Sequence, residues 1–222
     1  MPTFKHIPSG KKIFFIHIPR TAGRFIESNL VKNNNFIWED DIPSHIHHEG
    51  AATLFYNSPW YDAEINGFQL VHLHREIYEK YISELIPHIA IVRNPISKFI
   101  SGSFLVKRYY GDKIEMLQQF IPTNITKEKW FLEDFNFCNW HRPQVDFLTK
   151  KTHLWKFEDG MGDNFFEWLG EIVGIDLCYS DHVPYHKDDD ESNKMILTQT
   201  MEENILDFYK KDLKMYNSVS NI

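Results

Sequence analysis

Two stretches of this chain combine an apolar run with an arginine at its end, and each has the layout of an anion-binding site. The first, Phe14–Arg24, is Phe-Phe-Ile-His-Ile-Pro-Arg-Thr-Ala-Gly-Arg. Such an apolar run is typical of a buried parallel strand, and Pro19 ends it. The amphipathic residues at 25–30 predict a helix whose free backbone N–H groups and positive dipole end face the turn. With Arg20 and Arg24 beside those donors, we expect a ligand that carries phosphate or sulfate.

The second stretch, Ile89–Ser101, repeats this plan with Ile-Ala-Ile-Val-Arg-Asn-Pro-Ile-Ser-Lys-Phe-Ile-Ser. Pro95 has its φ preset for a first helical turn, and Asn94 is a good N-cap residue. Arg93 is therefore expected at the carboxyl end of a strand and Ser101 about two turns into the following helix. This arrangement predicts a second anion site.

Two histidines lie between these stretches, at positions where they could move a proton. His72 lies near the end of an apolar run, 68–73, that is expected to be a strand, and His74 follows directly, so both side chains point to one face. A histidine with a pKa near its usual value of about 6.5 is the common general base for a hydroxyl group. His17 has a different interpretation, because a histidine inside an apolar strand is more often a core or strand-end residue than a catalyst.

Taken together, these motifs resemble the nucleotide-binding motifs of sulfotransferases that use 3′-phosphoadenosine 5′-phosphosulfate (PAPS). The nearest likeness is to the carbohydrate type, which includes heparan uronosyl 2-O-sulfotransferases. Their usual first motif is His-Ile-Pro-Lys-Thr-Ala-Gly-Thr, from which this chain departs with Arg20 for Lys and Arg24 for Thr. Further matches are Gln144, Glu158 and the segment 208–213, so the resemblance spans nearly the whole chain. It implies a single sulfotransferase domain, 1–222, with a P-loop NTPase-like three-layer α/β fold: a central, mostly parallel sheet flanked by helices.

The resemblance also implies a role for each residue of the two motifs. Arg20 would neutralise the bridging oxygen while the S–O bond breaks, and His74 would be the base, supported by His72. Arg93 and Ser101 would bind the 3′-phosphate. No metal is required. The residues expected to bind the nucleotide are Arg20, Thr21, Ala22, Gly23, Arg24, Phe25, Arg93 and Ser101.

Charge limits the possible partners. The formal net charge of -7 argues against nucleic acid, whose binders carry broad basic surfaces. Any anion site must therefore be local, and Arg20, Arg24, Arg93 and Lys98 could focus positive potential into one cleft. An acidic exterior favours a neutral or lightly charged acceptor over a highly sulfated one. We expect a hydroxyl group of a glycan or of a small molecule.

Composition agrees with a compact enzyme. In 222 residues, 42% are hydrophobic, including 18 Phe, which is enough for a large core. No apolar run is long enough for a membrane span, and 1–12 lacks the apolar region of a signal peptide, so we expect a cytoplasmic protein. The Golgi lumen is the alternative for a chain that has lost an anchor. Cys138 and Cys178 are expected to be unpaired core thiols.

The remaining elements can be predicted only coarsely. Asn33, Asn34 and Asn35 should stop the first helix, and Gly174 should stop another. Thr200 and Glu203 have the spacing of a capping box. The predicted helices are 76–85, 114–120, 129–139, 165–173 and 202–216, and a short strand is predicted at 154–157.

Several features have a structural alternative. The histidines within 45–48 suggest a metal, but no Cys or acidic cluster completes a ligand set, so a loop is expected. Residues 188–191, all acidic, are expected in a solvated loop. Gln144 and Glu158 could be structural polar groups rather than ligand contacts.

Two other functions stay open at this level. A P-loop nucleotide kinase shares the strand-turn-helix plan, although the chain has no Gly-x-x-x-x-Gly-Lys-Ser/Thr motif. A catalytically silent PAP- or PAPS-binding protein is made possible by Arg20 and Arg24. The acceptor cannot be named from the sequence, because the segments 36–66 and 111–127 lack recognisable motifs.

Overall fold

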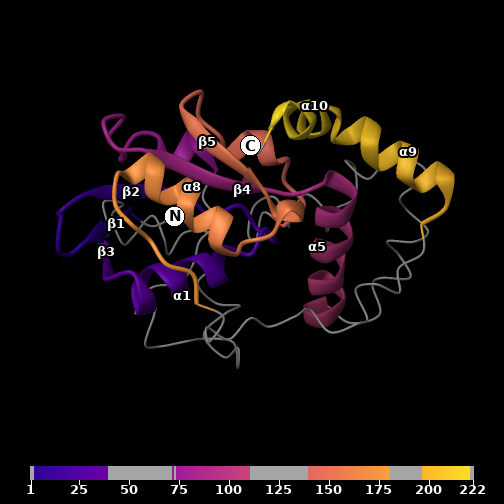
Figure 1. Cartoon of the computed structure of the whole chain (residues 1–222). Coiled ribbons are helices and arrows are strands. Elements are labelled where there is room, and N and C mark those ends of the chain that lie inside the picture. Colours follow the sequence, from indigo (N-terminus) through magenta and orange to yellow (C-terminus); the bar gives the residue numbers. More distant parts are fainter. Residues whose placement is uncertain (1–2, 40–71, 73, 111–139, 181–196, 221–222) are drawn as a thin grey trace.

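The computed structural model describes residues 3–39, 72, 74–110, 140–180 and 197–220. Figure 1 shows a central sheet with helices around it. In chain order, the described elements are β1 (Thr3–His6), β2 (Lys12–Ile16), α1 (Gly23–Asn33), β3 (Phe36–Glu39), α4 (Arg75–Tyr78), β4 (His88–Val92), α5 (Pro95–Tyr110), the 3₁₀-helix η2 (Gln144–Phe147), β5 (Thr152–Lys156), the 3₁₀-helix η3 (Phe157–Asp159), α8 (Asp163–Val173), α9 (Gln199–Phe208) and α10 (Lys210–Ser218).

The five described strands form one mixed sheet in the order β3-β1-β2-β4-β5. β2 pairs parallel with β4, and β4 pairs parallel with β5, whereas β1 pairs antiparallel with both β2 and β3. Ile16 lies opposite Ala90, so β2 and β4 end at the same edge of the sheet. Each is followed by a helix, α1 or α5, and the expected α/β class with two strand-turn-helix units is confirmed.

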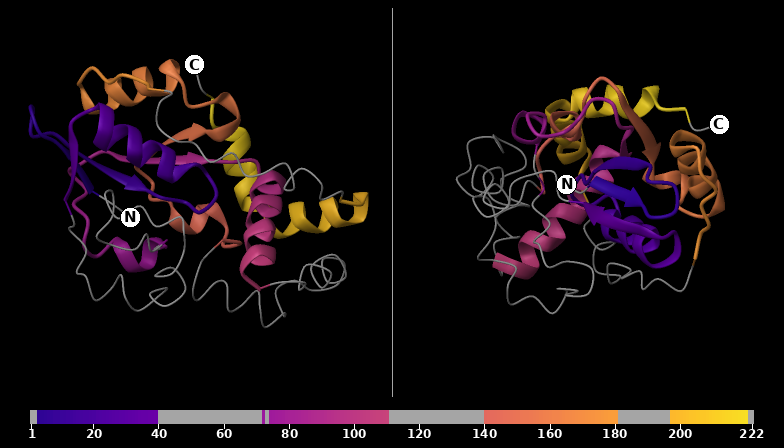
Figure 2. Two further views of the ribbon diagram at one scale, coloured as in Figure 1. Left: turned by 90° about the horizontal axis from the view of Figure 1, so that it is seen from below. Right: turned by 90° about the vertical axis from the view of Figure 1, so that its left-hand side faces the viewer.

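Helices α1 and α8 cover one face of this sheet, as the left view of Figure 2 shows. Every second residue of the strands points to this face and packs against the apolar sides of α1 and α8. The core on this side contains the buried residues Phe4, Ile13, Phe15, Phe25, Ile26, Leu30, Phe36, Ile89, Ile91, Trp155, Phe165, Phe166, Leu169 and Val173. Aromatic rings meet edge to face here, for example Trp155 with Phe165 at 5.5 Å between centroids.

The opposite face is covered by α4, η2 and α10. Because successive strand residues point to opposite faces, the alternate residues of β2 and β4 point to this side, among them Phe14, Ile16 and Val92. They pack with Tyr78 of α4 and Phe147 of η2. The Tyr78 hydroxyl donates to the carbonyl of Phe147, which ties α4 to η2. Helices on both faces give the predicted three layers.

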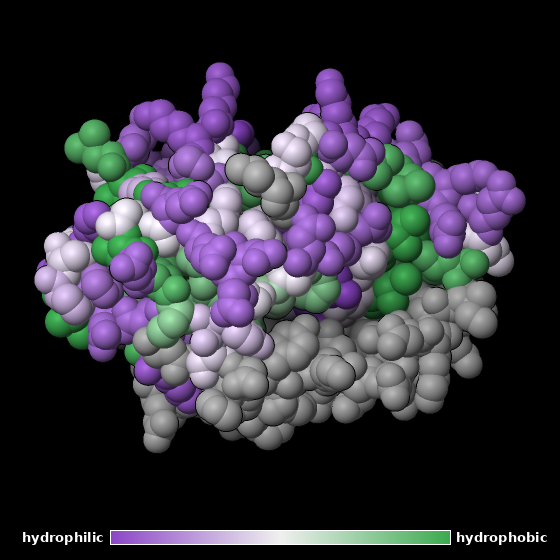
Figure 3. All heavy atoms as spheres, viewed as in Figure 1, coloured by the Kyte–Doolittle hydropathy of each residue, from purple (hydrophilic) through white to green (hydrophobic). Residues whose placement is uncertain are grey.

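α5 packs beside this core against α9 rather than on the sheet. Phe99 of α5 lies with Met201, Ile205 and Tyr209 in a separate small cluster. In Figure 3, hydrophobic residues come to the surface between α5 and α9, whereas the upper edge over β5 and α10 is hydrophilic. No helix within the described ranges is long and apolar enough to cross a membrane.

Several predicted boundaries hold. α1 ends at Asn33, and Asn35 has a φ of 54° in the left-handed region that asparagine tolerates. α8 ends at Val173, and Gly174 follows with a φ of 71°. β5 contains most of the predicted strand, although Phe157 starts the 3₁₀-helix η3 instead.

The helix predicted over 76–85 is wrong beyond its first turn. α4 ends at Tyr78, and the chain then turns, with Tyr81 N–H donating to the carbonyl of Tyr78. A further turn is closed by Ser83, whose hydroxyl accepts from the N–H of Leu85. Leu85 is 94% exposed, so continuing the helix would have buried no apolar surface there.

Three other local predictions are also wrong. Thr198, not Thr200, caps α9 by accepting a hydrogen bond from the N–H of Met201. The single helix predicted over 202–216 is divided at Tyr209 into α9 and α10. The Tyr209 side chain is 2% exposed and donates to the carbonyl of His141, which places this break against the core. Cys178 is exposed rather than buried, although Asn34 binds its backbone N–H and carbonyl and also accepts from its thiol at 3.6 Å.

The remaining predictions fall outside the described residues. They concern the helices at 114–120 and 129–139, most of the strand at 68–73, the histidines within 45–48, the acidic segment 188–191, and Cys138.

Candidate active site at the carboxyl edge of the sheet

The turn between β2 and α1 has a special backbone conformation. Arg20 and Ala22 both have positive φ, 67° and 65°, in the region that non-glycine residues rarely adopt. Ala22 is the N-cap of α1 and offers no side-chain oxygen, and the first turn of α1 holds no acidic residue. The first N–H groups of α1 therefore face outward from the helix without a side-chain cap, and this turn can donate to an anion.

The other residues of this turn fill different positions. Thr21 is fully buried, and its hydroxyl donates to the carbonyl of Ile18 at 2.8 Å, which leaves its oxygen lone pairs and backbone N–H for other contacts. The Phe25 side chain lies in the core, and its N–H donates to the carbonyl of Ala22. The side chain of Arg24 lies outside the described part of the structure.

The two motifs meet through their arginines. Arg20 Nε donates to Ser101 Oγ at 2.9 Å, across 81 positions of sequence. Arg93 Nη1 donates to the carbonyl oxygen of Arg20 at 3.1 Å. These bonds bring Arg20, Arg93 and Ser101 together at the carboxyl ends of β2 and β4.

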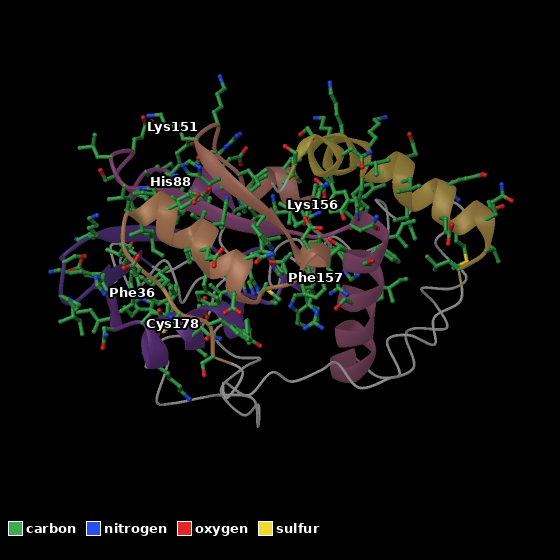
Figure 4. All side chains as sticks on the ribbon, viewed as in Figure 1. Phe36, His88, Lys151, Lys156, Phe157 and Cys178 are labelled. Atoms are coloured by element: carbon green, nitrogen blue, oxygen red, sulfur yellow. The ribbon has the colours of Figure 1, made fainter. Side chains whose placement is uncertain are left out.

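Arg93 is held in place on several sides. Its guanidinium lies over the ring of Phe157, 4.3 Å from the centroid, in a cation-π contact. Figure 4 shows Phe157 where β5 ends, beside α5. The backbone of Arg93 is bound by Gln144, whose amide accepts from its N–H at 2.8 Å and donates to its carbonyl at 2.7 Å. Gln144 thus acts on the second motif through the backbone of Arg93.

Gln144 is itself fixed by Asp212 of α10, a residue to which sequence reasoning assigned no role. The buried carboxylate of Asp212 accepts from the N–H groups of Gln144 at 2.7 Å and Val145 at 3.0 Å. Burial raises the pKa of Asp212, while these two hydrogen bonds and the charge of Lys98 oppose that rise. In the sequence, Asp212 lies in the segment 208–213 that matches the family, but an acidic residue in an amphipathic helix is usually solvated.

Asn94 and Glu158 secure the start of α5. The Asn94 side chain accepts from the N–H groups of Ile96 and Ser97, so the predicted N-cap is confirmed. The backbone N–H of Asn94 donates to Glu158 at 2.8 Å, and the second oxygen of Glu158 accepts from Tyr216 of α10. Glu158, like Gln144, therefore makes structural contacts behind the site.

The histidines lie on the α4 side of the same edge. His74 precedes α4 as its N-cap residue and is partly buried. Burial lowers the pKa of His74, the charge of Arg142 lowers it further, and Glu76 and Asp146 partly oppose both effects. The neutral imidazole is therefore favoured at neutral pH, which is the form that can accept a proton. His72 is also partly buried, and its ring contacts that of His17 at 4.9 Å between centroids.

Lys98 does not add charge to a cleft, contrary to the sequence prediction. It is 1% exposed, and its Nζ donates to the carbonyls of Trp140 at 2.8 Å and Arg142 at 3.0 Å. A lysine on the inner face of α5 can satisfy its amine only with buried acceptors, and these carbonyls supply them. Its role is to hold the segment that leads into η2.

Comparison with known proteins decides the family. A family model described as "Sulfotransferase family" matches residues 7–169, which include both motifs and the histidines between them. The chain belongs to the sulfotransferase family. The predicted sulfotransferase assignment is therefore confirmed at the level of the family, and with it a transferase of sulfuryl groups.

Other comparisons are more distant. A solved structure of a sulfotransferase from Alicyclobacillus acidocaldarius is similar to this chain with 13% sequence identity and a TM-score of 0.49, over 94% of this chain and 96% of that one. No curated protein matches the chain.

Proposed function

We propose that this sulfotransferase moves the sulfuryl group of PAPS to a hydroxyl group of an acceptor, with PAPS held at the carboxyl edge of the sheet. The observation that carries the proposal is the hydrogen bond from Arg20 to Ser101, because it joins the two motifs into one site. The strand-turn-helix unit with uncapped N–H groups suits the 5′-phosphosulfate. Arg93 and Ser101 suit the 3′-phosphate, which ATP and AMP lack.

Sulfuryl transfer mainly requires that the acceptor oxygen, sulfur and leaving oxygen be aligned and that the developing negative charge be stabilised. The acceptor oxygen attacks sulfur, the bond from sulfur to the bridging oxygen breaks, and negative charge moves onto the departing 5′-phosphate. In this proposal Arg20 and the N–H groups of Thr21, Ala22, Gly23 and Arg24 stabilise that charge. The departing phosphate is a weak base, so it needs neutralising charge more than a proton, and an arginine in place of the usual lysine can supply it.

The acceptor hydroxyl must also lose its proton. We assign the base to His74, since burial and Arg142 favour its neutral form, and we assign support or acceptor contact to His72. No metal is needed for either step of this proposal. The acceptor is proposed to be a carbohydrate, as in the uronosyl 2-O-sulfotransferases that the motifs resemble, or a small hydroxyl compound.

Nucleotide preference tests the donor. We expect 3′-phosphoadenosine 5′-phosphate (PAP) to bind about 1.5–3 kcal/mol more tightly than AMP, which corresponds to charge-assisted contacts with the extra phosphate. Thermal-shift titrations with both ligands measure the difference. Ser101→Ala should reduce the preference for PAP over AMP. The matched control is Ser97→Ala, one helical turn earlier in α5, which should leave that preference unchanged. Equal shifts for PAP and AMP would refute the 3′-phosphate assignment.

Turnover tests the reaction. Labelled PAPS is supplied with a panel of glycans and small hydroxyl compounds, and transfer of the label to at least one acceptor is expected. Tight PAP binding without transfer to any acceptor would identify a silent binding protein instead. Preference for ATP with Mg²⁺ and transfer of phosphate would identify a nucleotide kinase.

A further inference from the structure

A buried histidine-carboxylate pair lies directly behind the candidate site. His17 Nδ1 and Glu27 Oε1 of α1 are 2.9 Å apart, and their side chains are 6% and 1% exposed. The second carboxyl oxygen of Glu27 is buried and has no hydrogen-bond partner among the described residues. A carboxyl group with one unpaired oxygen is costly to bury, and an apolar residue at this position of α1 could pack in its place. Packing alone therefore does not account for Glu27.

The ring of His17 reaches two parts of the proposed machinery. A Cβ added to Gly23 would lie 2.3 Å from Nε2, 2.4 Å from Cδ2 and 2.5 Å from Cε1 of His17, so the imidazole packs against the first residue of α1. The same ring meets that of His72 in a T-shaped contact, with centroids 4.9 Å apart and planes at 76°. Gly23 belongs to the turn that would hold the phosphosulfate, and His72 lies on the acceptor side.

A carboxylate that binds one ring nitrogen fixes both the tautomer and the orientation of an imidazole. With the Nδ1 proton given to Glu27, a neutral His17 carries its lone pair on Nε2. The ring also packs so closely against Gly23 that a Cβ at that position would overlap it. His17 is therefore bound to Glu27 through Nδ1 and packs against both Gly23 and the ring of His72.

We propose that Glu27 and His17 form a positioning pair: the Glu27 carboxylate, acting through the His17 ring, sets the orientation of His72 and supports the first turn of α1. This inference rests on the proposed function, since His72 and Gly23 are assigned to transfer there. Neither residue of the pair touches the reacting atoms. Their effect is expected on the alignment of acceptor and donor.

The experiment uses the full chain, labelled with ¹⁵N-histidine, in three forms: wild type, Glu27→Gln and Glu171→Gln. Glutamine keeps the size of Glu27 and can still accept a hydrogen bond, but it loses the charge and can also present its NH₂ to the ring. Glu171 is an exposed carboxylate on α8 and serves as the control. Signals of His17 and His72 are assigned with His17→Asn and His72→Asn.

The first readout is histidine NMR without substrate. We expect wild-type His17 to keep its proton on Nδ1, and Glu27→Gln to mix the tautomers. The signals of His72, which Glu27 does not contact in the described structure, should shift as well. The signals of His88 and His141 should stay unchanged, and Glu171→Gln should leave all of these as in the wild type. If His72 does not respond to Glu27→Gln, the positioning pair is refuted, whatever the protein's activity.

The second readout is transfer at saturating PAPS. Glu27→Gln should lower kcat at least about tenfold, the scale for removing the carboxylate partner of a functional histidine. The Kd for PAP should change less than about threefold, and Tm should stay close to that of Glu171→Gln. A wild-type kcat in Glu27→Gln would overturn the positioning role. Absence of transfer in the wild type, with His72 still responding to Glu27→Gln, would refute the proposed function and uphold the coupling of the pair to His72.

Discussion

Arg20 donates from Nε to Ser101 Oγ at 2.9 Å, so the residue that departs from the usual lysine of the first motif is bonded to the serine of the second. A lysine carries a single terminal amine on a flexible stem. The planar guanidinium makes this bond through Nε and keeps its positive charge at any working pH. The substitution is therefore compatible with the lysine's proposed role.

The first prediction follows from that geometry. Arg20→Ala should lower transfer about 10²-fold or more, the effect of removing one donor to the transition state. Arg20→Lys should keep measurable transfer, because it retains the charge. The Kd for PAP should rise less than the rate falls. The measurement is turnover of labelled PAPS by all three proteins with the best acceptor. If wild type is inactive and Arg20→Lys gains activity, arginine at this position makes the chain a silent member of the family.

The second prediction concerns the pH dependence of transfer. The neutral form of His74 is the base, so kcat/KM should rise with pH as His74 loses its proton, with a midpoint at its pKa. Burial and Arg142 lower that pKa, so the midpoint should lie below the ordinary value of about 6.5. Arg142→Gln removes a positive charge and should move the midpoint up. Glu76→Gln removes an opposing negative charge and should move it down.

His74→Ala completes that test. It should lower transfer by about 10²–10⁴-fold, the usual contribution of a general base, and leave PAP binding intact. His72→Ala should have a smaller effect. Near-normal turnover by His74→Ala would show that His72 or another residue is the general base. The same conclusion would follow if neither Arg142→Gln nor Glu76→Gln moved the pH midpoint of kcat/KM.

Local sequence patterns predicted the parts of the site that depend on short-range rules. The run before Pro19 gave a buried strand, and Asn94 before Pro95 gave the N-cap of α5, because period and capping act within a few residues. Pairing of β2 with β4 then brought Arg20 and Ser101 together. The family resemblance had already placed them in one site.

Long-range contacts could not be predicted in the same way. Lys98 looked like a cleft cation, but its amine is used by carbonyls 42 and 44 positions away. Asp212 received no role from the sequence, yet it binds two N–H groups of η2. In both cases the partner is a backbone group, and a backbone group leaves no mark in the sequence.

The third prediction tests the support that Asp212 gives to the second motif. Asp212→Asn leaves one acceptor for two buried N–H groups, and an unpaired buried donor costs about 1–3 kcal/mol. We expect a loss of that size in the free energy of unfolding, measured with urea. PAP binding should weaken too, because Gln144 holds the backbone of Arg93. The control is Asp207→Asn, an exposed residue whose replacement should stay within about 0.5 kcal/mol. Asp212→Asn with unchanged stability and PAP affinity would disprove this support.

The last prediction concerns the turn before α1, where Ala22 has a φ of 65°. A left-handed conformation costs a non-glycine residue about 1–2 kcal/mol, and a β-branched side chain tolerates it least. Ala22→Gly relieves this strain but makes the unfolded chain freer by about 0.5–1 kcal/mol, so its stability should stay within about 1 kcal/mol of wild type. Ala22→Val should be destabilising by more than about 1 kcal/mol and should weaken PAP binding, because the turn cannot keep its shape.

Asn35 provides the matched comparison, because it also has a positive φ, 54°, but follows α1 at its far end. Asn35→Val should lower stability in the same way and leave the affinity for PAP unchanged. Urea unfolding and PAP titration of the three variants separate the two effects. If Ala22→Val binds PAP as tightly as Asn35→Val does, the left-handed turn is a feature of the fold alone and its N–H groups do not hold the nucleotide.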